Sequence, residues 1–149
     1  MTIKRIGHIA IRARDIEATA KFYREVLGMK EAFRMHNLEG GKLGSVHMFV
    51  APSNYIEIFP NGTTDGRGDH QTEVGLNHIC FEVDDLAKCL EEVRGRGAPI
   101  DTELKKGFSK CLQFWTHDPD GNRIEFMELP PDCYQIQANE RIAAEDAAR

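Results

Sequence analysis

The sequence predicts an α+β protein built from two βαβββ modules that form one curved mixed sheet around a cleft, with a C-terminal helical tail. Three observations predict this fold: an internal repeat, one amphipathic helix pattern in each half, and β-rich segments after each helix. The chain has 149 residues, enough for one domain or two small modules sharing a core. We expect a single domain with module one at 1–62, a linker at 63–74, module two at 75–130 and a tail at 131–149.

The repeat is clearest where each half begins. The first half opens with "GHIAIRARDI" and the second with "NHICFEVDDL". His8 and His78 are 70 positions apart, and so are Asp15 and Asp85. Because the same phrase occurs twice at one spacing, we expect the two halves to fold alike.

Each half continues with a helical pattern. In the first half the apolar positions that recur at the spacing of one helical face are Ile16, Ala20, Tyr23 and Leu27. Asp15 is the expected N-cap of this helix and Gly28 its expected stop. "LAKCLEEVRGRG" repeats the pattern after Asp85 in a shorter form. The Ala, Glu and Arg content of the tail favours a terminal helix after Pro130 and Pro131.

Extended segments follow both helices. They are "GSVHMFVA" and "NYIEIF" in the first half, and "KCLQFWTH" and "NRIEFMEL" in the second. Between the last two, "DPDG" at 118–121 predicts a hairpin turn. "NYIEIF" and "NRIEFM" match at an offset of 68, which pairs Glu57 with Glu125.

Strand alternation places one ionisable side chain of each segment on a common face. Neighbours in a strand point to opposite faces, so His8, Glu57, His78 and Glu125 lie opposite the aliphatic residues. Taken one at a time, such residues are more often structural histidines or solvated glutamates. Four at matching places in a repeat favour convergence in the concavity of the sheet. Two imidazoles and two carboxylates suit a divalent transition metal, so the predicted cleft is metal-binding.

The remaining histidines and the cysteines carry weaker signals. His36, His47, His70 and His117 have no partner in the repeat, and we expect them at the surface or in loops. The four cysteines form no CxxC pair and show no zinc-finger spacing, so we expect them to be reduced and buried.

Composition excludes several classes of partner. The net charge of −5 argues against nucleic acid or an anionic membrane as the main partner. No apolar run is long enough to span a bilayer, and the N-terminus lacks the pattern of a signal peptide. We therefore expect a cytoplasmic protein.

The opening "GHIAIRARDIEATAKFYREVLGM" and the later "THDPDGNRIEFME" resemble the vicinal-oxygen-chelate superfamily, which includes glyoxalase, bleomycin resistance and dioxygenase-like proteins. The resemblance covers residues 3–129, and it is greatest to glyoxalase I, the lactoylglutathione lyases. Those enzymes carry His or Gln, then Glu, His and Glu as metal ligands. In this chain the four places hold His8, Glu57, His78 and Glu125. Methylmalonyl-CoA epimerases are also similar, but they have Gln where this chain has Glu57.

The resemblance implies a divalent-metal-dependent lyase or isomerase. Its substrate would be the hemithioacetal of an aldehyde and a thiol, and its reaction a proton transfer through a metal-bound enediolate. One Ni, Zn or Co ion per site is implied, with Glu125 as the catalytic base and Glu57 as the partner that returns the proton. Arg12 and Asn61 match residues that bind the glutamyl end of glutathione, which implies a glutathione adduct as substrate. Short members of this family commonly form homodimers with each site built across the interface.

Two alternative functions remain open on the sequence. One is an iron-dependent extradiol-type dioxygenase that uses His8, His78 and Glu125 without Glu57. The other is a non-enzymatic resistance protein that binds a small molecule in the cleft. Metal content and the reaction catalysed would separate the three functions.

Overall fold

The computed structural model describes residues 3–37, 40–63, 72 and 74–148. It divides into two compact units, and each is described by itself. The first unit comprises Met1–Asp69 and Asp118–Asn122, and the second comprises His70–His117 and Arg123–Arg149. Part of the predicted linker, at 64–71 and 73, lies outside the described residues, and this part includes His70. The predicted module boundaries stay a prediction.

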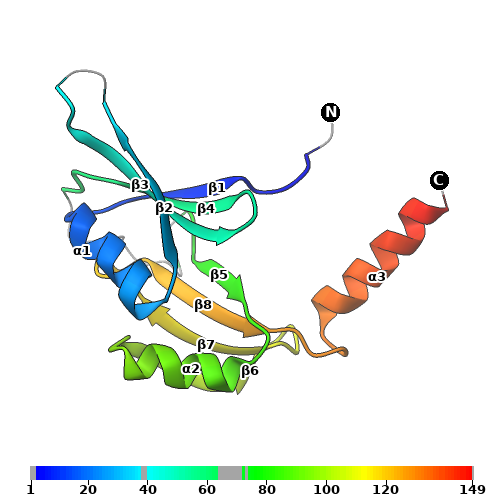
Figure 1. The fold of residues 1–149 in the computed structure, drawn as a ribbon. Helices are drawn as coiled ribbons and strands as arrows, with labels where there is room; N and C mark the ends of the chain where they lie inside the picture. The colour runs from blue at the N-terminus through cyan, green and yellow to red at the C-terminus, as the bar shows by residue number, and fades with distance from the viewer. Residues whose placement is uncertain (1–2, 38–39, 64–71, 73, 149) are drawn as a thin grey trace. The chain divides into compact units, whose positions relative to one another are not determined.

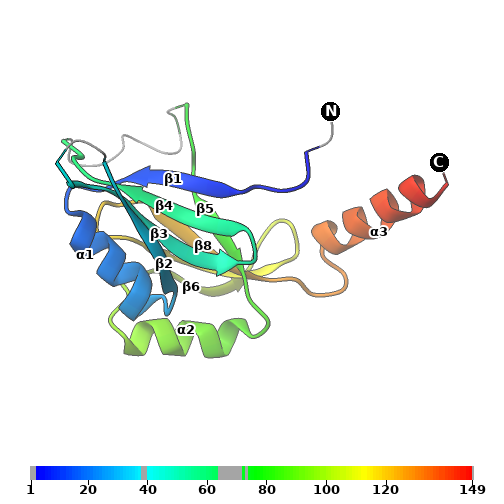
Figure 2. The ribbon, with the colours of Figure 1, turned by 45° about the horizontal axis from the view of Figure 1, so that its top comes forward.

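The first unit is a four-stranded mixed sheet with one helix packed against β3 and β4 (Figure 1, Figure 2). The strand order is β1-β4-β3-β2, with β1 parallel to β4 and the other pairs antiparallel. The elements are β1 (His8–Arg12), α1 (Ile16–Lys21), the π-helical turn η1 (Phe22–Val26), β2 (Lys30–His36), β3 (Leu43–Ala51) and β4 (Asn54–Phe59).

The first helix begins and ends where the sequence predicts. The Asp15 side chain accepts hydrogen bonds from the backbone N–H groups of Glu17 and Ala18, which caps α1. Gly28 has a φ of 75°, a conformation that favours glycine at a helix end. The last turn is wider than a regular α-helix, because the N–H of Leu27 bonds to the carbonyl of Phe22 five residues earlier.

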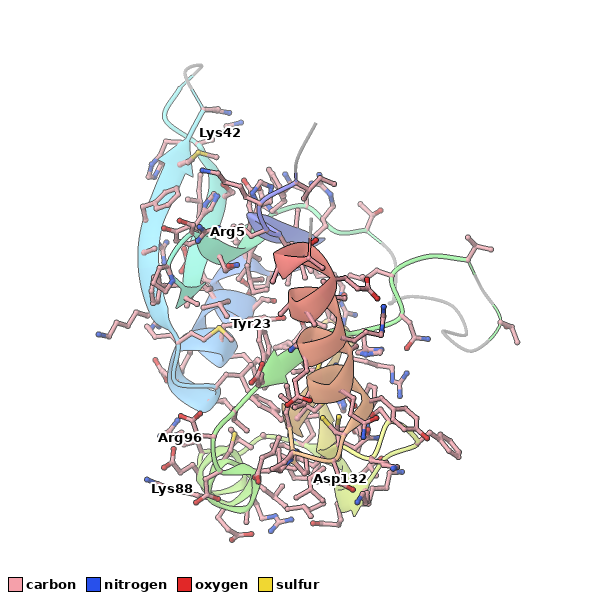
Figure 3. All side chains as sticks on the ribbon, turned by 90° about the vertical axis from the view of Figure 1, so that its right-hand side faces the viewer. Arg5, Tyr23, Lys42, Lys88, Arg96 and Asp132 are labelled. Atoms are coloured by element: carbon pink, nitrogen blue, oxygen red, sulfur yellow. The ribbon has the colours of Figure 1, made fainter. Side chains whose placement is uncertain are left out.

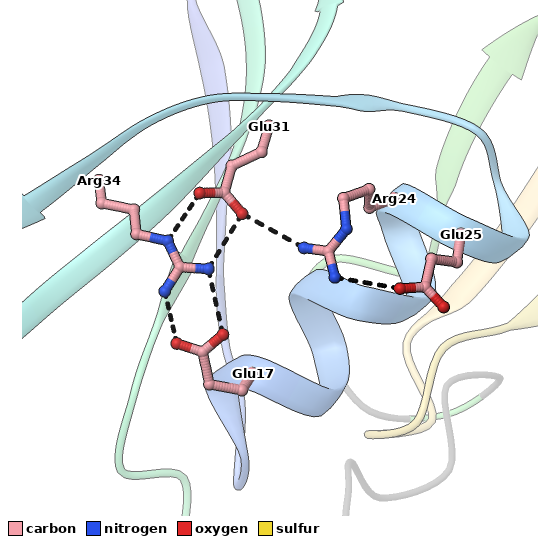
Figure 4. A network of polar contacts seen from close by, with 5 residues as sticks. All are labelled: Glu17, Arg24, Glu25, Glu31 and Arg34. Carbon is pink, nitrogen blue, oxygen red and sulfur yellow. Dashed lines mark hydrogen bonds and ion pairs between the residues drawn. The ribbon is translucent and has the colours of Figure 1, made fainter.

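A network of charged side chains joins the first helix to β2 (Figure 4). Arg34 donates to both Glu31 and Glu17, and Arg24 donates to Glu31 and Glu25. The hydrogen bond from Arg34 lowers the pKa of Glu31. The hydrogen bonds to Glu31 and Glu17 raise the pKa of Arg34. Exposed ion pairs contribute little singly, but a connected set positions edge strand β2 on the helix.

The second unit repeats the plan with strand order β5-β8-β7-β6, β5 lying parallel to β8. Its elements are β5 (Ile79–Glu82), α2 (Leu86–Gly95), β6 (Ile100–Lys106), β7 (Leu112–His117), β8 (Arg123–Glu128) and α3 (Tyr134–Ala147). Helix α2 packs against β6, β7 and β8. Asp85 caps it by accepting from the Lys88 N–H. Lys88 on the helix and Arg96 just after its end are exposed (Figure 3).

Each unit buries its own apolar core. The core of the first unit includes Ile11, Ala20, Tyr23, Val46, Met48, Ile56 and Ile58. That of the second includes Ile79, Leu86, Leu90, Val93, Phe114, Ile124 and Phe126. Phe114 and Phe126 stack with ring centroids 4.9 Å apart. Ile56 and Ile58 alternate with Glu57 along β4, and Ile124 and Phe126 alternate with Glu125 along β8, as the sequence predicts.

The turn between β7 and β8 belongs to the first unit. Asp118 organises it, because one carboxylate oxygen accepts from the N–H groups of Asp120 and Asn122. The other oxygen accepts from the Asn122 amide at 2.8 Å and from the Tyr23 hydroxyl at 3.3 Å. Burial raises the pKa of Asp118, although the hydrogen bonds from Asn122 oppose that effect.

Asp120 joins the same turn to the start of α1. Its Oδ1 atom accepts from the backbone N–H of Arg14 at 3.0 Å and from Arg14 Nε at 3.1 Å. Its Oδ2 atom accepts from the buried Thr19 hydroxyl at 2.7 Å. "DPDG" is thus a turn, as predicted, and also a contact that the sequence does not predict.

The α+β class, the two βαβββ modules and the C-terminal helix are confirmed. In the described residues the hydrogen-bonded ladders form two four-stranded sheets, one in each unit. The convergence of both units on one cleft stays a prediction. Cys111 and Cys133 are buried as expected, whereas Cys80 is exposed, and all four cysteines are free thiols.

Candidate functional site

In the first unit, the predicted ligands His8 and Glu57 lie next to each other. Parallel pairing of β1 with β4 sets Ala10 opposite Glu57 and places His8 on the same face. His8 Nε2 is 3.5 Å from Glu57 Oε2. The Glu57 residue is only 6% exposed, whereas His8 is exposed. A buried carboxylate therefore faces an imidazole that solvent can reach.

In the second unit, His78 and Glu125 form the matching pair. His78 immediately precedes β5, and its Nε2 atom is 3.2 Å from Glu125 Oε2. Glu125 is 8% exposed. The His78 and Trp115 rings meet at an angle of 71°, with their centroids 4.8 Å apart.

The neighbours of His78 indicate which of its nitrogens carries the proton. Asn77 Oδ1 accepts from Arg123 Nη1 at 3.1 Å and lies 2.8 Å from His78 Nδ1, so Nδ1 is the donor. In the neutral ring the lone pair of Nε2 then faces Glu125 Oε2. Imidazole nitrogen and carboxylate oxygen are both atoms that a divalent transition metal accepts as ligands.

His47 is a site residue that the sequence reasoning missed. It was expected at the surface or in a loop, but it lies in β3, opposite Glu57 in the antiparallel register, and is 6% exposed. Its Nε2 atom is 3.4 Å from Glu57 Oε1, and its ring stacks on Phe33 at 4.1 Å. Burial lowers the pKa of His47, although the charge of Glu57 opposes this effect. Alternation in "GSVHMFVA", with Val46 and Met48 in the core, is the signal that could have found it.

The other unpaired histidines lie away from these pairs where the structure describes them. His36 is exposed at the end of β2. His117 ends β7, and its Nδ1 atom is 2.9 Å from Asp101.

Gln113 is a second missed residue. With its amide oriented so that both ends are satisfied, the nitrogen donates to Glu125 Oε1 at 2.8 Å. The amide oxygen accepts from Trp115 Nε1 at 3.0 Å. The sequence offered no reason to single out this glutamine, because it has no ionisable group and no obvious place in the repeat.

The predicted substrate residues Arg12 and Asn61 lie at or just beyond the ends of β1 and β4. Arg12 is exposed, donates from Nη1 to the carbonyl of Pro60 at 2.7 Å, and lies over the Phe59 ring. Asn61 is exposed with a φ of 68°. Their binding role stays a prediction.

Each unit by itself contains one His–Glu pair, which is half of the predicted four-ligand site. Within the described residues no group of three or more His, Cys, Asp or Glu is arranged to hold a metal. The ion pairs of Glu57 and Glu125 in this part of the chain are made with histidines and not with Lys or Arg. Imidazole nitrogen and carboxylate oxygen are donors that Zn, Ni, Co and Fe accept, so each pair fits half of the predicted centre.

The family model of the "Glyoxalase/Bleomycin resistance protein/Dioxygenase superfamily" matches residues 5–126. The chain belongs to this superfamily. A lactoylglutathione lyase of Haemophilus influenzae is 32% identical over 130 residues, which are 83% of this chain and 91% of that protein. A probable chloroplastic lactoylglutathione lyase of Arabidopsis thaliana is 29% identical over 131 residues, 86% of this chain and 37% of that protein.

A solved structure, the glyoxalase family protein from Enterococcus faecalis, superposes with a TM-score of 0.72 at 27% identity. The superposed residues cover 86% of this chain and 100% of the Enterococcus faecalis protein. The chain spans less than half the length of the plant and yeast relatives that it matches. Among the described residues, no helix is long and apolar enough to cross a membrane.

Proposed function

We propose that the protein is a divalent-metal-dependent lyase of the glyoxalase I type. Its substrate would be the hemithioacetal of an aldehyde and a thiol, with a glutathione adduct as the first candidate. One observation carries the proposal: in each unit a buried glutamate faces a histidine at the place where the repeat pairs them. Lactoylglutathione lyases that align over most of both chains support the choice of reaction.

His8, Glu57, His78 and Glu125 would hold the metal, which we expect to be Ni, Zn or Co. When bound, such an ion stabilises the negative charge that develops on the substrate oxygens as a proton leaves carbon. The dioxygenase alternative has no ligand role for Glu57. The burial of Glu57 against His8 therefore favours the four-ligand lyase site.

The two glutamates would move the proton. Glu125 takes it from the carbon that bears the sulfur, and Glu57 returns a proton to the neighbouring carbon. The net change is an isomerisation, in which the hemithioacetal becomes a thioester with no atom gained or lost. Both carboxylates are held in low-exposure positions, which favours efficient proton transfer.

Arg12 and Asn61 would bind the carboxylate end of the thiol. A guanidinium group presents several donors, and an amide adds one more, which suits a carboxylate. Arg12 donates a hydrogen bond from Nη1 to the carbonyl oxygen of Pro60, and this bond holds the guanidinium at the end of β4.

The complete site would be assembled from two units. The first contributes His8 with Glu57, and the second His78 with Glu125. We propose a two-fold homodimer with two sites, in which the first unit of one chain faces the second unit of the other.

A metal titration tests the proposed site. The metal-free protein and its His78→Ala variant would be titrated with Ni²⁺ or Zn²⁺ in a calorimeter. We expect the variant to bind far more weakly, because an imidazole ligand is lost. His117→Ala is the matched control, because that histidine pairs with Asp101 and contacts neither glutamate in the described structure. Equal loss of binding in both variants would contradict the proposed ligand set.

A further inference from the structure

In both units the second oxygen of the glutamate also has a partner, and that partner comes from the adjacent antiparallel strand. In the first unit His8 lies by Glu57 Oε2, and His47 of β3 lies by Oε1 at 3.4 Å. In the second unit His78 lies by Glu125 Oε2, and Gln113 of β7 donates to Oε1 at 2.8 Å. In each unit one carboxylate oxygen faces the repeated histidine, and the other faces a side-chain nitrogen from the adjacent antiparallel strand.

The same contact is made by different residues at different positions. The register sets His47 opposite Glu57 and Trp115 opposite Glu125, so Trp115 occupies the place of His47. A tryptophan N–H cannot replace the imidazole there, because Trp115 donates to the Gln113 amide instead. Gln113, two residues earlier on the same strand, supplies the nitrogen. Because the contact recurs although the residue that makes it differs, duplication of the sequence alone does not explain it.

Both donors are held in place by their surroundings. The His47 ring is buried and stacks on Phe33, and Tyr55 meets it edge-on at 6.3 Å. His47 Nδ1 is buried with no hydrogen-bond partner in the described part of the chain, so the contact with Glu57 is the one that orients the ring. The Gln113 amide is held by Trp115 and packs so closely on Gly107 that a Cβ atom there would overlap it.

We infer that His47 and Gln113 are positioning residues that hold Oε1 of Glu57 and of Glu125 and leave Oε2 of each for the metal. The inference rests on the proposed function, since it concerns the same centre. A nitrogen that lies against Oε1 competes with a metal for that oxygen and holds the plane of the carboxylate. Each glutamate would then present Oε2 to the metal, in an orientation set by His47 or Gln113. Nothing in the ligand set itself provides this restraint.

Substitutions that remove the donor but keep the volume test the inference. In His47→Leu and Gln113→Leu we expect the affinity of the metal-free protein for Ni²⁺ or Zn²⁺ to fall between about tenfold and a hundredfold. The number of ions bound per chain should not change, because no ligand is removed. His47→Gln restores a nitrogen donor and should recover most of the affinity. Gly107→Ala leaves every polar group in place but displaces the Gln113 amide, so it should weaken binding in the same direction.

Matched controls are available on the surface. His36→Leu and Gln137→Leu remove exposed side chains of the same kinds and should leave metal affinity unchanged. Unchanged affinity in His47→Leu and Gln113→Leu as well would overturn the inference. Loss of a whole equivalent of metal in His47→Leu would also overturn it, since His47 would then be a ligand.

A measurement on the metal-free protein separates this inference from the proposed function. ¹⁵N chemical shifts of the His47 ring should show the proton on Nε2, facing Glu57, and a bare Nδ1. The opposite tautomer would refute the positioning role, whatever the metal data show. If the tautomer is as expected but the protein binds no divalent metal, the proposed function fails and the contact between His47 and Glu57 stands.

Discussion

Asp120→Asn should destabilise the protein in a pH-dependent way, because Asp120 ties the turn between β7 and β8 to the first helix. The carboxylate accepts three hydrogen bonds, two from Arg14 and one from Thr19. Asparagine keeps the shape and one acceptor oxygen, but it removes the charge. Its amide nitrogen also faces a group that donates to Asp120 in the native protein.

The magnitude follows from the partners. A hydrogen bond to a charged group contributes about 1.5–3 kcal/mol, but part of this is retained by the asparagine oxygen. The Arg14 side chain is about half exposed, so its ion pair contributes little. We therefore expect a loss of about 1–2 kcal/mol in the free energy of unfolding at pH 7.

The difference between the two proteins should shrink in acid. Burial tends to raise the pKa of Asp120, but the bonds from Thr19 and Arg14 outweigh it, so the pKa in the folded state is lowered. A carboxylate with a lowered folded pKa stabilises the fold above its unfolded pKa of about 3.9. That contribution is lost as the pH falls through the folded pKa.

Urea unfolding of both proteins at pH 7 and at several acidic pH values measures this effect. The slope of the free energy against urea should be the same in both. Asp132→Asn is the control, because Asp132 is exposed and its contact with Lys106 is a 3.4 Å surface ion pair. A loss in Asp120→Asn that is the same at every pH would refute the reasoning, and so would no loss at pH 7.

Three further predictions follow from the site and the cores. Arg12→Ala should raise KM for a glutathione adduct several-fold with little change in kcat, and a fall in kcat at constant KM would contradict the carboxylate role. Phe114→Ala should lower the free energy of unfolding by about 3–5 kcal/mol, because the ring is fully buried against Phe126. Glu57→Ala and Glu125→Ala chains unfolded and refolded together should recover about a quarter of full activity, because half of randomly paired dimers would hold one intact site. Activity that stays at the level of the separate variants, despite proven subunit exchange, would rule out a site shared between chains.

The internal repeat made much of this structure predictable. Each element occurs twice in the repeat, so two matching patterns support each prediction. The caps at Asp15 and Asp85 are one example, and the strand faces that carry Glu57 and Glu125 are another. Local rules of capping and alternation then place these residues without any knowledge of long-range contacts.

Contacts that are made by different residues in the two halves, or that join distant residues, escaped prediction. His47 was judged by its lack of a partner, yet its register position in the other unit holds Trp115, and Gln113 makes the equivalent contact. The bond between Asp120 and Thr19 joins residues 101 positions apart, which no local pattern reports. The burial of Glu57 depends likewise on the neighbouring strand, and not on its own segment.

The most direct test of the proposed lyase is turnover of the methylglyoxal–glutathione hemithioacetal by protein freed of metal and then reloaded with Ni²⁺, Zn²⁺ or Co²⁺. We predict thioester formation that requires the metal and that falls by about 10²- to 10⁴-fold in Glu125→Gln, while that variant still binds much of its metal. Near-normal turnover by metal-loaded Glu125→Gln would move the base to another residue. Iron-dependent oxygen consumption on a catechol, with no conversion of the hemithioacetal by the metal-loaded protein, would contradict the lyase function itself.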